Sequence, residues 1–302
     1  MTPFFYLVMM FLFGTAIGSF SNVLIFRYNP DLNVFSPPHI SGRSHCPKCG
    51  HNLSWYELIP VVSFLIQGGR CRSCNAKISW QYIIVELIGG SIFAGIPLFL
   101  NSFYGIAGKA FFAFSLPYWY YCLIASWILV FWVLLLITVI DLRLFIIPDE
   151  LTIFLIVLGA GITFFLSQNI HGLLTPFRTS FLQQYELLLA PISSIWLSHI
   201  AGAIGGFLFF LALSILTRGR GIGFGDVKLS FALGIIFGWP DIAILSILAF
   251  IVGGLWSVGL VILGAKKMKD KVPFAPFFVV GTLLTFFFGM AIVKGYLGAF
   301  GL

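Results

Sequence analysis

Eight long apolar runs dominate this chain of 302 residues and restrict the folds that it can adopt. A helix needs about 20 residues to cross a bilayer. We predict spans near this length over 4–26, 82–101, 117–140, 151–168, 197–217, 227–240, 241–264 and 274–297, of which the sixth is short. The first span begins almost at Met1 with no basic segment before it, which favours a retained helix over a cleaved signal peptide. With 60% hydrophobic and 9% charged residues, the composition lies outside the usual range of soluble domains. We therefore predict an all-α polytopic membrane protein with about eight transmembrane helices.

The Lys and Arg residues divide unequally between the two sets of loops that eight alternating spans create. Three of the 17 basic residues lie in one set: Lys109, Arg178 and Lys294. The other fourteen lie in the opposite set: Arg27, Arg43, Lys48, Arg70, Arg72, Lys77, Arg143, Arg218, Arg220, Lys228, Lys266, Lys267, Lys269 and Lys271. Because basic loops remain on the cytoplasmic side, we expect both termini outside the cytoplasm. Attraction of these loops to anionic headgroups accounts for the net charge of +7, so we expect membrane lipids and no nucleic acid as partners.

The long loop after the first span contains two C-x2-C pairs separated by 21 residues: Cys46, Cys49, Cys71 and Cys74. This spacing is typical of a tetrahedral zinc site with four thiolate ligands. Gly50 and Asn75 directly follow the two pairs, and both suit the tight turns that would point two sulfurs at one metal. Two disulfides or a redox dithiol are the alternatives, and disulfides are disfavoured in the reducing cytoplasm. A closed four-sulfur site has no open coordination position, so we expect the zinc to be structural.

Two of the ten acidic residues lie at the same predicted depth in the membrane. Asp141 ends the third span, and Asp226 opens the sixth in the stretch GIGFGDVKLS. Such a pair suits water activation, because an ionised carboxylate can accept a proton from water while a protonated one polarises a carbonyl. Gly223 and Gly225 would let a substrate backbone come close. The sequence therefore predicts an acid pair at the cytoplasmic edge of the bilayer.

Structural roles for these acids are equally consistent with the residues alone. Asp226 could cap the N-terminus of a helix, since aspartate is a favoured capping residue. Asp141 could form an ion pair with Arg143 or Lys228. Asp149 could be a turn residue after the preceding proline. The pattern by itself leaves catalysis and capping open.

Two further residues inside the predicted spans are unusual for their surroundings. Glu86 lies a few residues inside the second span, where a carboxylate is costly, so it could pair with a basic group or line a polar cavity. Cys122 lies inside the third span and is expected to be a small core residue.

Several segments resemble the type IV prepilin peptidases, which are bifunctional leader peptidases and N-methyltransferases of pilus assembly and type II secretion. These segments are GSFSNVLIFR, the two C-x2-C pairs with WYELIPVVSF between them, YIIVELIGG, IDLRLFIIPDELT, GIGFGDVKLSFALG and VPFAPF. The likeness extends over nearly the whole chain. One such motif alone is weak evidence, whereas this ordered set is specific.

The resemblance implies an aspartyl membrane protease whose catalytic acids correspond to Asp141 and Asp226. It places Asp149 near the pair but outside it. Together with Lys228 and the glycines before Asp226, Asp149 is expected to lie where the substrate backbone approaches. The implied substrates are prepilins or pseudopilins, which combine a short basic leader with an apolar helix. Their cleaved bond lies at the cytoplasmic interface, at the depth predicted for the two acids.

The resemblance also implies methyl transfer from S-adenosylmethionine to the new N-terminus, served by the first span and the cytoplasmic loop. The matching positions are Gly18, Asn22, Arg27 and Glu57. We expect three regions: a first span over 1–26, a zinc-binding loop domain associated with methyl transfer over 27–81, and a membrane peptidase domain over 82–302. The implied location is the bacterial inner membrane, with periplasmic termini and the catalytic aspartates at the cytoplasmic side.

Two other functions would account for part of this pattern. A transporter could use interfacial acids as proton relays and a zinc domain as a regulator, but transport needs polar groups at the membrane midplane, where this sequence has almost no charge. An intramembrane protease of presenilin type would share the G-x-G-D motif alone. That class gives no account of the four cysteines.

Overall fold

The computed structural model describes residues 3–104, 117–169, 180–189, 194–219, 221–265, 267, 270–299 and 301. Within these residues the chain is helical, apart from loops and two isolated β-bridges, His45–Asn52 and Arg70–Lys77. The chain divides into two compact units, Met1–Trp132 and Val133–Leu302. Five of the basic residues used to predict the orientation lie outside the described residues: Lys109, Arg178, Arg220, Lys266 and Lys269.

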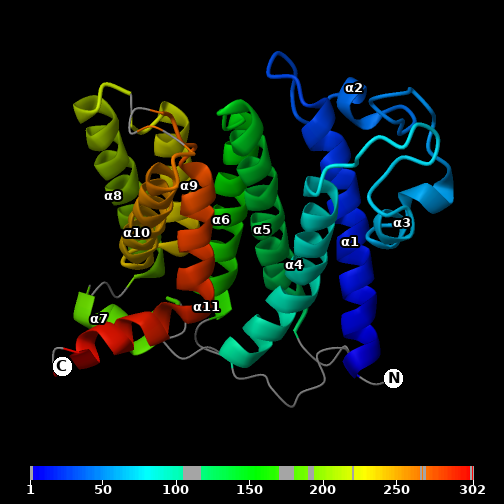
Figure 1. The fold of residues 1–302 in the computed structure, drawn as a ribbon. Helices are drawn as coiled ribbons and strands as arrows, with labels where there is room; N and C mark the ends of the chain where they lie inside the picture. Colours follow the sequence, from blue (N-terminus) through cyan, green and yellow to red (C-terminus); the bar gives the residue numbers. More distant parts are fainter. Residues whose placement is uncertain are drawn as a thin grey trace. The chain divides into compact units, whose positions relative to one another are not determined.

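The first unit is built on two long helices that pack side by side through glycines (Figure 1). Its helices are α1 (Pro3–Arg27), α2 (Pro37–Ile40), η1 (Trp55–Leu58), α3 (Val62–Ile66), α4 (Gln81–Phe103) and the first part of α5 (Tyr118–Leu144). A Cβ atom added to Gly14 would lie 2.5 Å from the carbonyl oxygen of Gly89, and one added to Gly18 would lie 2.7 Å from Cα of Glu86. Small residues allow this close approach of α1 and α4, which is a common way for helices to associate in membranes.

In the second unit a short helix, α9, packs mainly against α8 and α6, and all three are labelled in Figure 1. Its helices are the end of α5, α6 (Asp149–Asn169), η3 (Gln183–Tyr185), α7 (Glu186–Leu189), α8 (Ile195–Leu216), α9 (Phe224–Phe237), α10 (Asp241–Ile262) and α11 (Ala275–Ala299). A Cβ atom at Gly234 of α9 would lie 2.5 Å from Cα of Ala203 in α8. On α8, the Phe210 ring lies 4.8 Å from that of Phe278 and 5.7 Å from that of Phe250, measured between centroids. The glycine contact packs α9 closely against α8, and the ring contacts join α8 to α10 and α11.

Seven helices in the described part of the chain are long and apolar enough to cross a membrane: Phe4–Arg27, Gln81–Phe103, Tyr118–Leu144, Asp149–Gln168, Ile195–Leu216, Asp241–Ile262 and Ala275–Ala299. They correspond to seven of the eight predicted spans. The remaining predicted span, 227–240, is α9, which has 14 residues. At 1.5 Å per residue α9 extends about 21 Å, less than the hydrocarbon core of about 30 Å. The fold is thus an all-α polytopic membrane protein, and the short predicted span is a helix buried within the second unit.

Candidate active site and zinc centre

Asp141 lies in the last turn of α5, and its side chain is only 5% exposed. Its Oδ2 atom accepts a hydrogen bond of 3.3 Å from the backbone amide of Ala275, the first residue of α11. The amides at a helix N-terminus carry partial positive charge and favour a nearby anion. The start of α11 therefore orients one oxygen of Asp141.

Asp226 is the third residue of α9, and its side chain is 9% exposed. Its Oδ2 atom accepts a hydrogen bond of 3.0 Å from the backbone amide of Gly223, the residue just before the helix. The carboxylate thus caps the start of α9 from inside the first turn and is not itself the N-cap residue. Because this contact uses only Oδ2, the same side chain can cap the helix and take part in catalysis.

Asp141 and Asp226 line the same cavity, which has a volume of about 1080 Å³. The rest of the lining comes from the end of α5, the segment before α9, α10 and the segment that leads into α11. It includes the aromatic rings of Phe250, Phe274 and Phe277, the small residues Gly223, Gly253, Gly254 and Ser257, and the charged residues Lys267, Asp270 and Lys271. Two carboxylates that line one cavity can divide acid and base roles between them.

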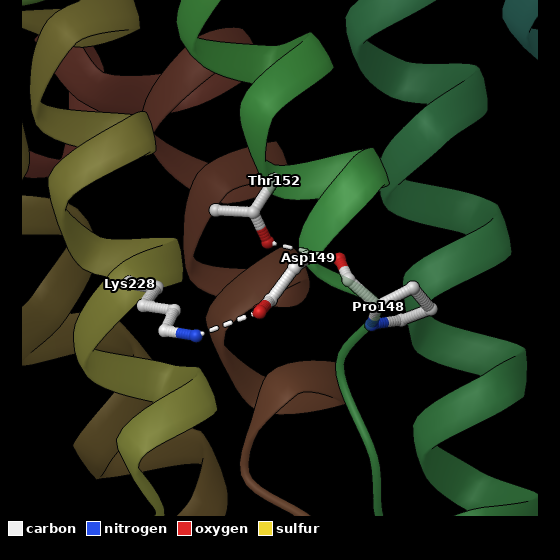
Figure 2. Close-up of polar contacts among 4 residues, drawn as sticks. All are labelled: Pro148, Asp149, Thr152 and Lys228. Atoms are coloured by element: carbon white, nitrogen blue, oxygen red, sulfur yellow. Dashed lines mark hydrogen bonds and ion pairs between the residues drawn. The ribbon is translucent and has the colours of Figure 1, made fainter. Parts of the chain in front are cut away.

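Asp149 and Lys228 form an ion pair that joins α6 to α9 (Figure 2). Lys228 Nζ lies 2.8 Å from Oδ1 and 2.9 Å from Oδ2 of Asp149. Gly225, on the same turn as Asp226, packs against the Ile147 side chain, where an added Cβ would lie 3.2 Å from Ile147 Cβ. Of the four positions expected near the substrate backbone, Gly223 belongs to the described lining of the cavity, whereas Gly225, Asp149 and Lys228 do not.

The four cysteines of the predicted zinc site come together in the first unit: Cys46, Cys49, Cys71 and Cys74. Their sulfurs all lie within 4.8 Å of one another, and Cys46 Sγ is 3.9 Å from Cys74 Sγ. Zn–S bonds of about 2.3 Å in a tetrahedron separate the sulfurs by about 3.8 Å, whereas a disulfide needs about 2.0 Å. All four are free cysteines. The arrangement therefore fits one zinc ion with four thiolate ligands.

Each cysteine pair lies on a tight turn of the same construction. The amide of Gly50 donates to the carbonyl of Cys46, and the amide of Asn75 donates to that of Cys71, both at 2.9 Å. Gly50 and Asn75 have φ values of 70° and 58°, the left-handed region in which these two residue types are favoured. Backbone amides of Cys49 and then Lys48 lower the pKa of the Cys46 thiol to about 6. The first turn thus favours the thiolate form of Cys46, the form that a metal ligand requires.

The four residues expected to serve methyl transfer lie in the first unit, and each has a defined structural contact. Gly18 lies against α4, as described above. Arg27 donates to the carbonyl oxygens of Ser41, Gly42 and Arg43 and so holds the start of the loop.

The other two are buried polar side chains. Glu57 accepts a hydrogen bond of 2.9 Å from the amide of Ser54 and caps η1. Asn22 is 1% exposed, and its Nδ2 donates to the carbonyl of Tyr82 at 3.1 Å. Its Oδ1 atom is buried without a hydrogen-bond partner in the described part of the chain. Asn22 therefore offers one buried acceptor that a bound group could use.

Two family models match separate parts of the chain. Residues 12–100 match the model of the bacterial peptidase A24 N-terminal domain, and residues 128–258 match that of the type IV leader peptidase family. A prepilin leader peptidase/N-methyltransferase of Aeromonas hydrophila is 30% identical over 99% of this chain and 96% of the relative. The chain belongs to the type IV leader peptidase family.

Similarly named relatives occur in other bacteria. The Bacillus subtilis protein is 28% identical over 96% of this chain and 98% of its own length. A Burkholderia pseudomallei protein is 34% identical over 82% of this chain and 67% of its own length. No solved structure matches the chain. Within this family member, the N-terminal match contains the four cysteines, and the leader peptidase match contains Asp141 and Asp226. The Ala275 amide that contacts Asp141 lies beyond both matched ranges.

Two buried acids have partners that no sequence motif indicated. Glu86 accepts a hydrogen bond of 2.7 Å from the backbone amide of Val61, which ties the loop to α4. Asp241 starts α10 with no exposed surface and accepts hydrogen bonds from Ser180 Oγ and from the amide of Phe181, the latter at 2.9 Å. In both cases a carboxylate anchors a backbone segment that is distant in sequence.

Proposed function

We propose that this protein cleaves the basic leader from prepilins or pseudopilins, with Asp141 and Asp226 as the catalytic acids. The observation that carries the proposal is that both buried carboxylates line one cavity in a member of the leader peptidase family. The names of its relatives support the same activity. The transporter alternative is not favoured by the family membership.

In the proposed reaction one carboxylate is ionised and accepts a proton from a water molecule, and the water oxygen attacks the scissile carbonyl carbon. The other carboxyl group is protonated and donates a hydrogen bond to the carbonyl oxygen, where negative charge develops. The carbon–nitrogen bond then breaks, and the leaving amine takes up a proton. Each acid accepts one backbone amide at a helix start, Asp141 from Ala275 and Asp226 from Gly223, so these contacts favour a negative charge on both, and we assign one shared proton to the pair before water attack.

The cavity lining suits a substrate that is extended near the cleaved bond and apolar beyond it. Gly223, Gly253 and Gly254 leave space for a peptide backbone, and Phe250, Phe274 and Phe277 provide apolar contact. The proposed orientation places the cavity at the cytoplasmic side of the inner membrane and both termini in the periplasm, because basic loops remain in the cytoplasm. Although α9 is short, it returns the chain along α8, since Ser198 Oγ near the start of α8 donates to the carbonyl of Trp239 just after α9, and the direction of the chain therefore still alternates.

We also propose N-methylation of the new N-terminus by the first unit. Asn22 Oδ1 is the buried acceptor that would receive a hydrogen bond from an amino group of S-adenosylmethionine, and Glu57 lies in the loop that the family assigns to the same domain. When bound, S-adenosylmethionine supplies an electrophilic methyl group. Gly18 and Arg27 would hold α1 and the loop in place through the contacts described above.

The test is to incubate the purified full-length protein with one prepilin, with and without S-adenosylmethionine, and to weigh the products by mass spectrometry. The proposal expects loss of the leader in both samples and the mass of one added methyl group only when S-adenosylmethionine is present. An uncut prepilin would contradict the peptidase assignment. A cut but unmethylated product would contradict the methyltransferase assignment alone.

A further inference from the structure

The ion pair between Asp149 and Lys228 links the two chain segments that carry the proposed catalytic acids (Figure 2). Asp149 is the first residue of α6, and Lys228 is the fifth residue of α9. Both carboxylate oxygens of Asp149 lie within 2.9 Å of Lys228 Nζ. Thr152 Oγ1 donates to the Pro148 carbonyl at 3.2 Å, which holds the first turn of α6 in place. The pair therefore joins two ordered helix starts.

The connection from Asp141 to Asp149 is short and constrained. The amide of Phe145 donates to the carbonyl of Asp141 at 2.9 Å, and Phe145 has a φ of 57°, so α5 ends in a defined turn. Ile147 then packs against Gly225 of α9, and Pro148 fixes the backbone just before α6. A displacement of Asp149 is therefore transmitted to Asp141 through only seven intervening residues.

The connection from Lys228 to Asp226 is shorter still, because the two residues are separated by one position on α9. Two steps along an α-helix rotate the side chain by about 200°, so Asp226 and Lys228 point to nearly opposite sides. Asp226 faces the cavity, whereas Lys228 faces α6. In the described part of the chain, neither Lys228 nor Asp149 belongs to the cavity lining. The ion pair is therefore placed to act on the acids and not on the substrate.

Exposure argues against a role in overall stability. The Lys228 side chain is 37% exposed and that of Asp149 is 63% exposed. Ion pairs this accessible to water stabilise proteins little, because their attraction is screened and ordering two side chains costs entropy. Their directional contact can still select one arrangement of two helices that other contacts already bring together. In this second unit, α6 and α9 also pack through Gly159 and Ile235.

We propose that the Asp149–Lys228 ion pair is a positioning clamp that sets the separation of the Asp141 and Asp226 carboxylates. This inference rests on the proposed function, because it assigns the clamp to the same acid pair. The clamp closes a ring in which Asp141 is joined to Asp149 by the turn after α5, and Lys228 is joined to Asp226 through one intervening residue of α9. Opening the ring lets the start of α9 shift relative to the end of α5.

The test is a double-mutant cycle on cleavage of one prepilin by the purified full-length protein. The variants are Asp149→Asn, Lys228→Met and the two combined. Each single variant should lower kcat about tenfold with KM within about twofold, because a displacement of about 1 Å between reacting groups can cost up to about 100-fold. The double variant should lose no more than either single variant, because the clamp is already open. Glu150→Gln is the matched control, since it removes a charge from the same turn of α6 without touching the pair, and its kcat should be unchanged.

Two outcomes would overturn the clamp. One is wild-type kcat in both single variants. The other is a double variant whose loss is the product of the single losses, which would mean that the two side chains act independently, for example on the substrate. Asp141→Asn and Asp226→Asn, measured in the same assay, distinguish failure of the clamp from failure of the proposed function. If those variants still cleave, the acid assignment is wrong; if they are inactive while the clamp variants behave as wild type, only the clamp is wrong. Monodisperse elution and an unchanged Tm show that each variant is folded.

Discussion

The backbone amide of Ala275 lies 3.3 Å from Oδ2 of Asp141, although the two residues are 134 positions apart in the sequence. This contact brings the N-terminus of α11 to the end of α5. It distinguishes the two acids of the cavity, because Asp141 receives an amide from a distant helix and Asp226 receives one from its own helix start. The orientation of Asp141 therefore depends on where α11 begins, whereas that of Asp226 depends on its own helix.

Removing the Ala275 amide should weaken catalysis without breaking α11. Ala275 is the first residue of the helix, a position that accepts proline because its amide has no partner within the helix. Ala275→Pro should therefore lower kcat by about tenfold or more, since a hydrogen bond to a charged group contributes about 1.5–3 kcal/mol. Ala275→Gly keeps the amide and is the control, which should retain most of the activity. Equal activity of the two variants in a prepilin cleavage assay would show that the contact is not used.

Asp141→Asn and Asp226→Asn should each abolish cleavage of a prepilin, because an amide can neither accept the proton of water nor donate the proton of a carboxylic acid in this role. Asparagine caps helices about as well as aspartate, so the Gly223 amide keeps an acceptor in Asp226→Asn and α9 should still form. Expression and zinc content should stay normal. Near-normal cleavage by Asp226→Asn would mean that capping is its whole role.

Asp149→Asn should retain more activity than either of these variants. Its carboxylate contacts Lys228 and is not part of the described cavity lining. We expect kcat to fall about tenfold in Asp149→Asn, because a small displacement of reacting groups has an effect of this size. The variants of the catalytic acids should lose all activity. Initial rates of the three variants, compared at saturating prepilin, check this order. A completely inactive Asp149→Asn with an unchanged Tm would place Asp149 in the reaction itself.

The four cysteines should bind about one zinc ion per chain, as a closed four-thiolate site requires. Metal analysis of the purified protein measures this ratio. Chelation should expose the loop to proteases, because binding of a structural zinc contributes folding free energy directly. Serine at all four positions should remove the metal, whereas Cys122→Ser should retain it, since Cys122 lies outside the cluster. Unchanged zinc after the fourfold substitution contradicts the site.

Glu57→Ala should lower methylation and spare cleavage. The substitution leaves the part-buried amide of Ser54 without its acceptor, at a cost of about 1 kcal/mol, and so loosens the loop of the first unit. The acids that line the peptidase cavity belong to the second unit and should be unaffected. Glu57→Gln keeps an acceptor for that amide, so any remaining loss of methylation in this variant measures the need for the charge. Equal loss of both activities in folded Glu57→Ala would mean that the loop also serves the peptidase.

The sequence alone determined the features that depend on local composition and spacing. Apolar runs of sufficient length define seven spans, because every backbone polar group in lipid must be satisfied within a helix. The cysteine turns were also predictable, since glycine and asparagine are the residues that adopt positive φ most easily, and Gly50 and Asn75 do so. The shortness of α9 was visible in the length of its apolar run.

Only the tertiary structure decided which distant groups meet. The amide of Ala275 at Asp141, Lys228 at Asp149 and the amide of Val61 at Glu86 join residues that no local pattern relates. Two of these contacts involve backbone donors, which every residue except proline possesses, so residue type carries no signal for them. The ion pair could equally have formed between Lys228 and Asp141 on charge alone. Packing of α6 against α9 selects Asp149 instead, because it determines which carboxylate lies within reach of the lysine.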